Sequence, residues 1–262
     1  MNTLETIEAH RSIRQFKSDP IPQGDLDAII HSATRGSSSG NMQTYSIIVT
    51  RDPKRREALW ELHLEQDMIR QAPVLLTFCV DWNRMNQWCR LRGATPGFDN
   101  FLCFLVGFAD ALIAAQNAAL AAESIGYGIC YMGTTLCATP GLIEHFGLPD
   151  GVFPATTLVV GLPDEDPEPR ARLPLESVVH EEEYQEFDED RTLETYRDRE
   201  AEGWNRYMKF PDLARRIRES GVTNLAQVYT EVKYTAERNR GFSRDLLGGL
   251  AGQGFMRDDE PT

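Results

Sequence analysis

Stretches rich in β-branched and other apolar residues recur along the first two thirds of the chain and are typical of strands buried within a sheet. Each stretch is short and is bounded by proline, glycine, asparagine or aspartate, which mark turns. The chain therefore predicts about four strands, at residues 45–50, 73–80, 126–133 and 154–161.

Between the second and third predicted strands lies the most apolar segment, Phe101–Ser124. Its length and near-continuous apolar character predict a long helix that lies centrally or at an interface. Asp110, Gln116 and Asn117 interrupt the segment, so we interpret it as a buried helix and not as a membrane span. The residues before it, 81–100, carry two tryptophans and two glycines and predict an excursion from the sheet that covers a site or a partner subunit.

Together with this segment, polar and apolar periodicity predicts seven or eight helices in all. Asn2 and Glu5 have capping-box spacing, and Pro53 and Pro140 stand where a first helical turn favours proline, with Thr139 as the expected cap of the second. Other helices are expected at 25–33, 53–63 and 243–252. Together the elements predict an α+β fold with helices on both faces of one sheet. We expect a core at 1–183 and a helical extension of the same domain at 184–262.

The composition narrows the class of protein. The 27 basic and 40 acidic residues give a formal charge of −13, which argues against nucleic acid or an anionic membrane as the main partner. Five cysteines are widely spaced without metal-ligand spacing, and Cys79 and Cys103 lie in apolar runs, so we expect small core residues in a reducing cytosol. The first residues show no signal-peptide pattern, which also favours a cytoplasmic location.

The sequence has no motif of a hydrolytic enzyme or of a nucleotide-binding loop. It contains no G-x-S-x-G, H-E-x-x-H or Walker A motif, and no strand is followed by G-x-G-x-x-G. The five histidines are scattered, and the acidic runs 181–183 and 188–190 are typical of solvated faces. We therefore expect no metal site and no catalytic side chain, and instead an organic cofactor that supplies its own reactivity.

Four features indicate what that cofactor is. A basic cluster at 10–14 and a basic pair at 170 and 172 can bind a phosphate, because guanidinium groups present paired donors to anionic oxygens. The small residues at 36–40 and the glycine turn at 131–134 let backbone amides approach a ligand closely. The cluster is equally compatible with a solvated helix end, and the small-residue loop with a flexible surface turn. Taken together, the four features favour flavin mononucleotide (FMN) over a dinucleotide.

The same residues resemble those of the FMN-dependent nitroreductases, specifically the oxygen-insensitive NADPH nitroreductases and NADPH–FMN flavin reductases. The resemblance runs from about residue 4 to about residue 185, and its motifs occur in the family's order and at its separations. They are HRSIR at 10–14, SSS at 37–39 with Gln43, AQNA at 115–118, AAESIG at 121–126, YMG at 131–133, RARLP at 170–174 and VHE at 179–181.

The resemblance implies a three-layer α/β/α fold with a mostly antiparallel or mixed sheet and an intertwined homodimer. It also implies two FMN sites lined by both chains. NADPH, or NADH, would donate a hydride in a ping-pong reaction, and nitroaromatics, quinones or free flavin would accept it. The same fold could serve another acceptor (an enone, a halogenated aromatic or a metal ion), or a flavin-binding sensor without turnover.

The resemblance also implies roles for single residues. His10, Arg11 and Ser12 would hold phosphate or ribityl oxygens, Arg14 would lie near the ribityl chain or N1, and Arg170 and Arg172 would reach the phosphate. Ser38, Ser39 and Gln43 would come from the partner chain. The backbone of Tyr131, Met132, Gly133 and Thr134 would meet the N5 and O4 edge, and Gln66 lies where the subgroup has a flavin-contacting glutamine.

Two positions depart from the subgroup. Thr134 stands where relatives often have a second glycine, which is tolerable only if the turn does not need a positive φ. Arg170 replaces a lysine, which keeps the charge and changes the geometry. Beyond Tyr184 the match fades, and Arg197, Arg199 and Arg206 are candidates for an NADPH 2′-phosphate contact or ordinary helix-surface residues.

Overall fold

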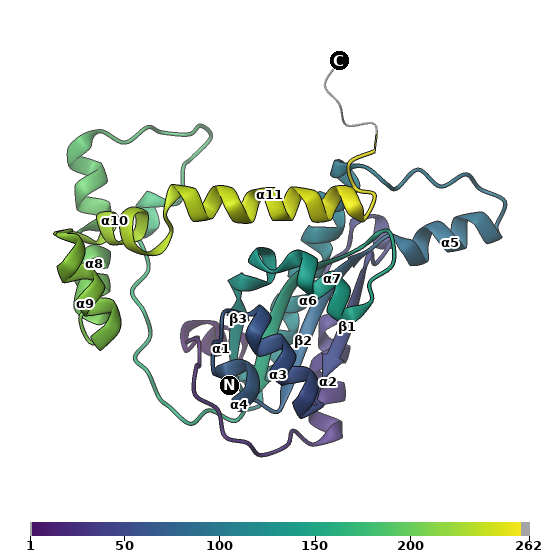
Figure 1. The fold of residues 1–262 in the computed structure, drawn as a ribbon, viewed down its shortest axis with the longest axis horizontal. Helices are drawn as coiled ribbons and strands as arrows, with labels where there is room; N and C mark the ends of the chain where they lie inside the picture. The colour runs from purple at the N-terminus through teal and green to yellow at the C-terminus, as the bar shows by residue number, and fades with distance from the viewer. Residues whose placement is uncertain (1, 258–262) are drawn as a thin grey trace. The chain divides into compact units, whose positions relative to one another are not determined.

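The computed structural model describes residues 2–257, which cluster into two compact units, residues 2–168 with 242–257 and residues 169–241. The first unit contains a four-stranded sheet in the order β1-β2-β4-β3, and every neighbouring pair is antiparallel (Figure 1). The strands are β1 (Tyr45–Thr50), β2 (Val74–Asp81), β3 (Gly128–Met132) and β4 (Val152–Gly161).

Helices cover both faces of this sheet. Alternate residues of β2 point to opposite faces: Leu76 and Phe78 join one core cluster, and Leu75 joins the other. This produces the three-layer α/β/α arrangement. The first unit contains α1 (Thr3–Glu8), α2 (Gln23–Ala33), α3 (Pro53–Leu62), α4 (Met68–Gln71), α5 (Asn83–Leu91), α6 (Phe101–Ser124) and α7 (Thr139–Phe146).

The long helix α6 is the centre of one layer. Ala111, Ala115 and Ala118 of this helix are fully buried, and the helix packs against all four strands and α2. Its length and hydropathy would suffice to cross a membrane, but this packing is that of a core helix. Gly107 makes the close approach possible, because a Cβ there would lie 2.6 Å from Val80 Cγ1.

Residues 169–241 form a helical unit with a small core of its own around Tyr207, Ile217 and Val228. Its helices are α8 (Glu189–Tyr207), α9 (Pro211–Ser220) and α10 (Leu225–Gln227), followed by a π-helical turn at Val228–Lys233. The helix α11 (Ala236–Gly252) begins in this unit and ends in the first, where Leu250 and Phe255 join the sheet's core.

Several sequence predictions are confirmed. The capping box of Asn2 and Glu5 is present, α6 has its predicted bounds, and Pro53 occupies the first turn of α3. Two predictions are wrong. Residues 2–257 contain eleven α-helices, more than seven or eight, since one-turn helices such as α4 have no periodic signal. Thr139 is not the cap of α7: Ala138 occupies that position, and the Thr139 hydroxyl donates to Leu136 O at 3.1 Å.

Candidate functional site

The basic cluster lies beside β3. After α1 ends, Ser12 forms a parallel bridge with Ile129, and the Ile13 N–H donates to Ile129 O at 2.9 Å. Gly128 permits this approach, because a Cβ there would lie 2.7 Å from Ile13 Cγ1. The cluster and the glycine turn at the end of β3 therefore share one edge of the sheet. Ile129 and Gly133 are four residues apart, or about 13 Å at ~3.3 Å per residue.

The charged groups of the cluster already have acidic partners. Arg11 Nη2 lies 2.5 Å from Asp166 Oδ1, and the Arg14 and Gln15 N–H groups donate to the Glu165 carboxylate. Arg11, Glu165 and Asp166 help to line a cavity of about 490 Å³. An anion that enters this cavity must therefore compete with the carboxylates of Glu165 and Asp166, which lie in an acidic loop at residues 164–168.

Glu123 of α6 holds the His10 side chain in place. Its Nδ1 lies 2.6 Å from Glu123 Oε1, and the Glu123 side chain is largely buried. Glu123 also contributes, after burial, to raising the pKa of Tyr131, whose hydroxyl donates to Gln116 Oε1 at 3.3 Å. Tyr131 thus remains a neutral hydroxyl at physiological pH.

The glycine turn is open to a ligand. Gly133 begins a 3₁₀ helix (Gly133–Cys137), whose first N–H groups have no acceptor within the helix. Gly133 is exposed, and no other group lies within 4 Å of the position a Cβ would take there. Within residues 2–257, Thr134 is not among the positive-φ positions, so the turn does not require glycine there. Backbone donors that the helix itself does not use, beside open space, fit the edge of a flat heteroaromatic ring.

Gln66 and Thr134 meet in the structure, although 68 residues separate them in the sequence. Gln66 Nε2 donates to Thr134 Oγ1 at 3.3 Å and to His63 O at 3.0 Å. His63 Nδ1 lies 2.8 Å from the same hydroxyl oxygen. His63 is fully buried, and burial lowers its pKa to about 4. Sequence reasoning missed His63, because nothing local marks it as a neighbour of Thr134.

The small-residue loop at 36–40, called the serine loop below, is held by hydrogen bonds to Asp110 of α6. Sequence reasoning noted Asp110 only as an interruption of an apolar helix. Asp110 is buried and accepts hydrogen bonds from Ser38 Oγ at 2.8 Å, Ser39 N at 2.9 Å and Thr44 Oγ1 at 3.0 Å. Ser38 Oγ in turn accepts from the Gln43 N–H at 2.7 Å.

The serine loop and the basic cluster lie apart within one chain. Asp110, which binds the loop, and Glu123, which binds His10, are separated by 13 residues of α6, or about 20 Å at ~1.5 Å per residue. The structure therefore does not bring Ser38 and Ser39 to the basic cluster of the same chain.

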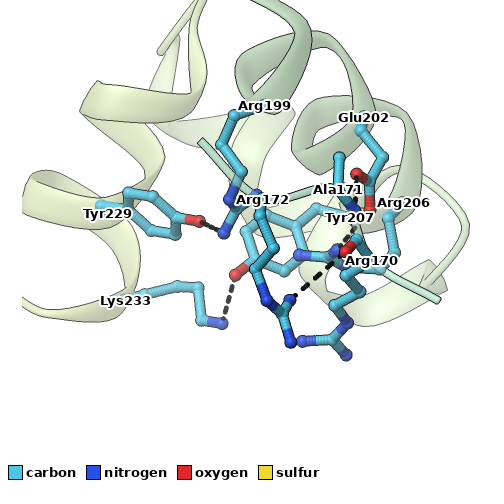
Figure 2. Close-up of polar contacts among 9 residues, drawn as sticks. All are labelled: Arg170, Ala171, Arg172, Arg199, Glu202, Arg206, Tyr207, Tyr229 and Lys233. Atoms are coloured by element: carbon cyan, nitrogen blue, oxygen red, sulfur yellow. Dashed lines mark hydrogen bonds and ion pairs between the residues drawn. The ribbon is translucent and has the colours of Figure 1, made fainter. Parts of the chain in front are cut away.

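Arg170 and Arg172 lie in the helical unit, among the polar contacts drawn in Figure 2. Arg172 Nη1 donates to Arg170 O at 3.3 Å, and the intervening Ala171 N–H donates to Glu202 Oε2 at 3.0 Å. Lys233 Nζ donates to Tyr207 Oη at 2.9 Å. Burial alone would raise the pKa of Tyr207, but this hydrogen bond and the lysine charge outweigh it and lower the pKa.

The three candidates for a 2′-phosphate contact all have partners within this unit. Arg199 donates to Tyr229 Oη at 2.7 Å and Arg206 to Glu202 Oε1 at 3.2 Å, as Figure 2 shows. Arg197 pairs with Glu194 at 2.5 Å.

Comparison with known proteins agrees with these features. The model of the Nitroreductase family matches residues 7–162. The chain is 40% identical over 187 residues to the oxygen-insensitive NADPH nitroreductase of Salmonella typhimurium, covering 71% of this chain and 76% of that protein. It is 36% identical over 199 residues to an FMN reductase (NADPH) of Bacillus subtilis, covering 74% and 80%.

The solved structures extend the likeness over almost the whole chain. The NADPH:FMN oxidoreductase of Vibrio harveyi in complex with NAD⁺ superimposes with a TM-score of 0.80 at 29% identity, over 98% of this chain and all of that one. The chain belongs to the Nitroreductase family, whose members are FMN-dependent oxidoreductases with NAD(P)H as the electron donor.

Proposed function

We propose that this protein binds FMN at the β3 edge and uses NAD(P)H to reduce nitroaromatics, quinones or free flavin. The observation that carries the proposal is the Ser12–Ile129 bridge, because the basic cluster and the open glycine turn then lie on one edge of the sheet, about 13 Å apart at ~3.3 Å per residue. Relatives named as an NADPH nitroreductase and an FMN reductase support the same chemistry.

In this proposal the chain binds and orients the cofactor, and bound FMN supplies the hydride chemistry at N5. His10, Arg11, Ser12 and Arg14 hold the phosphate and ribityl oxygens, while the Tyr131–Thr134 backbone and Gln66 meet the ring. Arg11 must exchange Asp166 for the phosphate, and a phosphate can replace that carboxylate because it offers more anionic oxygens to the planar guanidinium. The assignment of Arg170 and Arg172 to the phosphate, which the family resemblance implies, stays a prediction, since both residues belong to the helical unit.

We further propose a homodimer in which each site takes Ser38, Ser39 and Gln43 from the partner chain. The separation of the serine loop from the basic cluster within one chain supports this arrangement. The exposed apolar residues of α6 support it as well, since Leu102 is 68% and Leu105 46% exposed. Such a face is typical of a surface that another chain covers. The five free cysteines favour a reducing cytosol as the location.

The test is an absorbance spectrum of the purified protein, before and after anaerobic addition of NADPH and, separately, NADH. We expect a flavin band that bleaches within seconds, and the faster nicotinamide identifies the donor. A band that does not bleach would favour a flavin-binding sensor. A protein that stays colourless after FMN is added would contradict the proposal.

A further inference from the structure

His63, at the C-terminal end of α3, is a buried side chain with one partnered and one unpartnered ring nitrogen. Nδ1 lies 2.8 Å from Thr134 Oγ1. Nε2 has no hydrogen-bond partner among residues 2–257, and the residue is 0% exposed. Leu64 and Glu65 follow with φ of 58° and 56°, and this left-handed turn returns the chain so that Gln66 reaches the same hydroxyl.

The hydrogen-bond partners available to the two ring nitrogens determine the tautomer of His63. If Nε2 carried the proton, a fully buried N–H would have no acceptor, and orphaned buried N–H groups are rarer in proteins than orphaned acceptors. If Nδ1 carries the proton, it donates to Thr134 Oγ1 at 2.8 Å, and Nε2 is left only as an unused acceptor. The Nδ1–H tautomer therefore has the lower free energy.

The same hydrogen-bond count leaves the hydroxyl hydrogen of Thr134 without an acceptor in this group. A threonine hydroxyl has two lone pairs and one hydrogen. Gln66 Nε2 and His63 Nδ1 together occupy both lone pairs of Thr134. The hydroxyl hydrogen then needs a different acceptor, and Thr134 is partly exposed beside the open Gly133 turn.

We propose that His63 and Gln66 act as positioning residues that both donate to Thr134, so that the Thr134 hydroxyl donates its own hydrogen to an acceptor atom of the bound flavin ring. The proposal rests on the proposed function. It makes Thr134, at the position that departs from the family pattern, a side-chain ligand in addition to the backbone donors. Reduction places more negative charge on the flavin acceptors, so this hydrogen bond stabilises the reduced cofactor more than the oxidised one.

The first test needs no cofactor. ¹⁵N NMR of the histidine rings in the FMN-free protein reports which nitrogen carries the proton, and the signals lost in His63→Asn identify His63 among the five histidines. We expect the Nδ1–H tautomer. The Nε2–H tautomer would overturn the proposal whatever the protein binds.

The second test compares Thr134→Val, which removes the hydroxyl, with Thr134→Ser, which keeps it. The readouts are the dissociation constants of oxidised FMN and the reduction potential of bound FMN. We expect the valine variant to bind oxidised FMN about fivefold more weakly. We also expect the ratio of reduced to oxidised affinity to fall about fivefold, which is about 20 mV for a two-electron couple. The serine variant should differ from wild type by less than about twofold in each.

Two substitutions of His63 form a matched pair of variants. In His63→Asn the side-chain amide stands near the position of Nδ1 and keeps a donor for Thr134, whereas in His63→Gln it extends toward the unpartnered Nε2 position. We expect the asparagine variant to keep the wild-type potential and the glutamine variant to shift as Thr134→Val does.

The outcomes separate the possible failures. A loss of affinity in Thr134→Val with an unchanged potential would mean that the threonine only supports the turn, and the proposal would be wrong. Failure of wild-type protein to bind FMN would refute the proposed function and this proposal together, and the His63 tautomer would then describe the turn alone.

Discussion

Arg11 is the side chain on which the proposed phosphate site depends most, and it already has an anionic partner in Asp166. That pair is more than a third exposed at both ends, so it is weak and exchangeable. Arg11 can therefore exchange its ion pair with Asp166 for one with a ligand phosphate. Substitutions of Arg11 and of Asp166 should for this reason change FMN binding in opposite directions.

Arg11→Ala should weaken FMN binding about tenfold or more, because a charge-assisted hydrogen bond is worth about 1.5–3 kcal/mol. Asp166→Asn should tighten binding severalfold, because it removes a competing charge. Isothermal titration with FMN measures both. Arg51→Ala, which removes an exposed arginine outside the site, is the control and should bind as wild type. Equal affinities for wild type and Arg11→Ala would refute the phosphate assignment.

The lowered pKa of His63 makes the free energy of unfolding depend on pH. Burial lowers its pKa to about 4 in the folded protein, whereas an unfolded histidine titrates near 6.5. Between these values the unfolded state binds more protons, so the free energy of unfolding falls as the pH is lowered from 6.5 to 4. The loss should approach about 3 kcal/mol.

Urea unfolding at several pH values measures this loss, and His63→Asn supplies the control. The carboxylates, and His145, whose pKa is also lowered by burial and then by Arg55, titrate in both proteins. The difference between the two curves therefore isolates His63. A constant difference from pH 6.5 to pH 4 would contradict the expectation.

At the scale of elements, two helical glycines should respond in opposite directions to the same substitution. Gly107→Ala in α6 places a methyl group 2.6 Å from Val80 Cγ1 and 3.2 Å from Thr44 O, so we expect a loss of about 1–3 kcal/mol through overpacking. Gly248→Ala in α11 meets nothing within 4 Å and should gain up to about 1 kcal/mol from helix propensity. Thermal or urea unfolding of both variants tests this, and a stabilised Gly107→Ala would show that α6 is not held so closely to β2.

The elements also show where local sequence signals suffice. The β1 segment 45–50 and the α6 segment 101–124 have the predicted bounds, because each is predominantly apolar and is bounded by polar residues. The excursion at 81–100 was predicted without its helix, α5 (Asn83–Leu91), whose only buried residue is Asn86. The excursion is anchored where Trp82 and Phe98 stack with ring centroids 4.5 Å apart, a pairing that neither residue signals alone.

At the scale of the whole molecule, a mixed dimer tests the proposal that two chains build each site. Arg11→Ala and Gln43→Ala homodimers should each bind FMN poorly. A heterodimer of the two variants, co-expressed with different affinity tags, has both substitutions in one site and neither in the other. We expect it to bind one FMN per dimer with wild-type affinity. Binding as poor as that of the homodimers would mean that Arg11 and Gln43 serve the same site from one chain.

The sequence by itself determined the four strands and the long helix of this protein, and the family to which it belongs. Strand and helix patterns, a basic cluster and small-residue turns are local properties, and they led to an FMN-dependent family whose model the chain matches. The role of each site residue stays a prediction. Only the tertiary structure decided which groups meet.

The pairing of Ser12 with Ile129, of Arg11 with Asp166, of Asp110 with Ser38 and of His63 with Thr134 joins residues at least 71 positions apart. Such contacts depend on how the layers pack around the sheet, and the side chains alone carry no signal of their distant partners. Their competition for hydrogen bonds, which sets the charge and the donors of the site, therefore exists only in the folded chain.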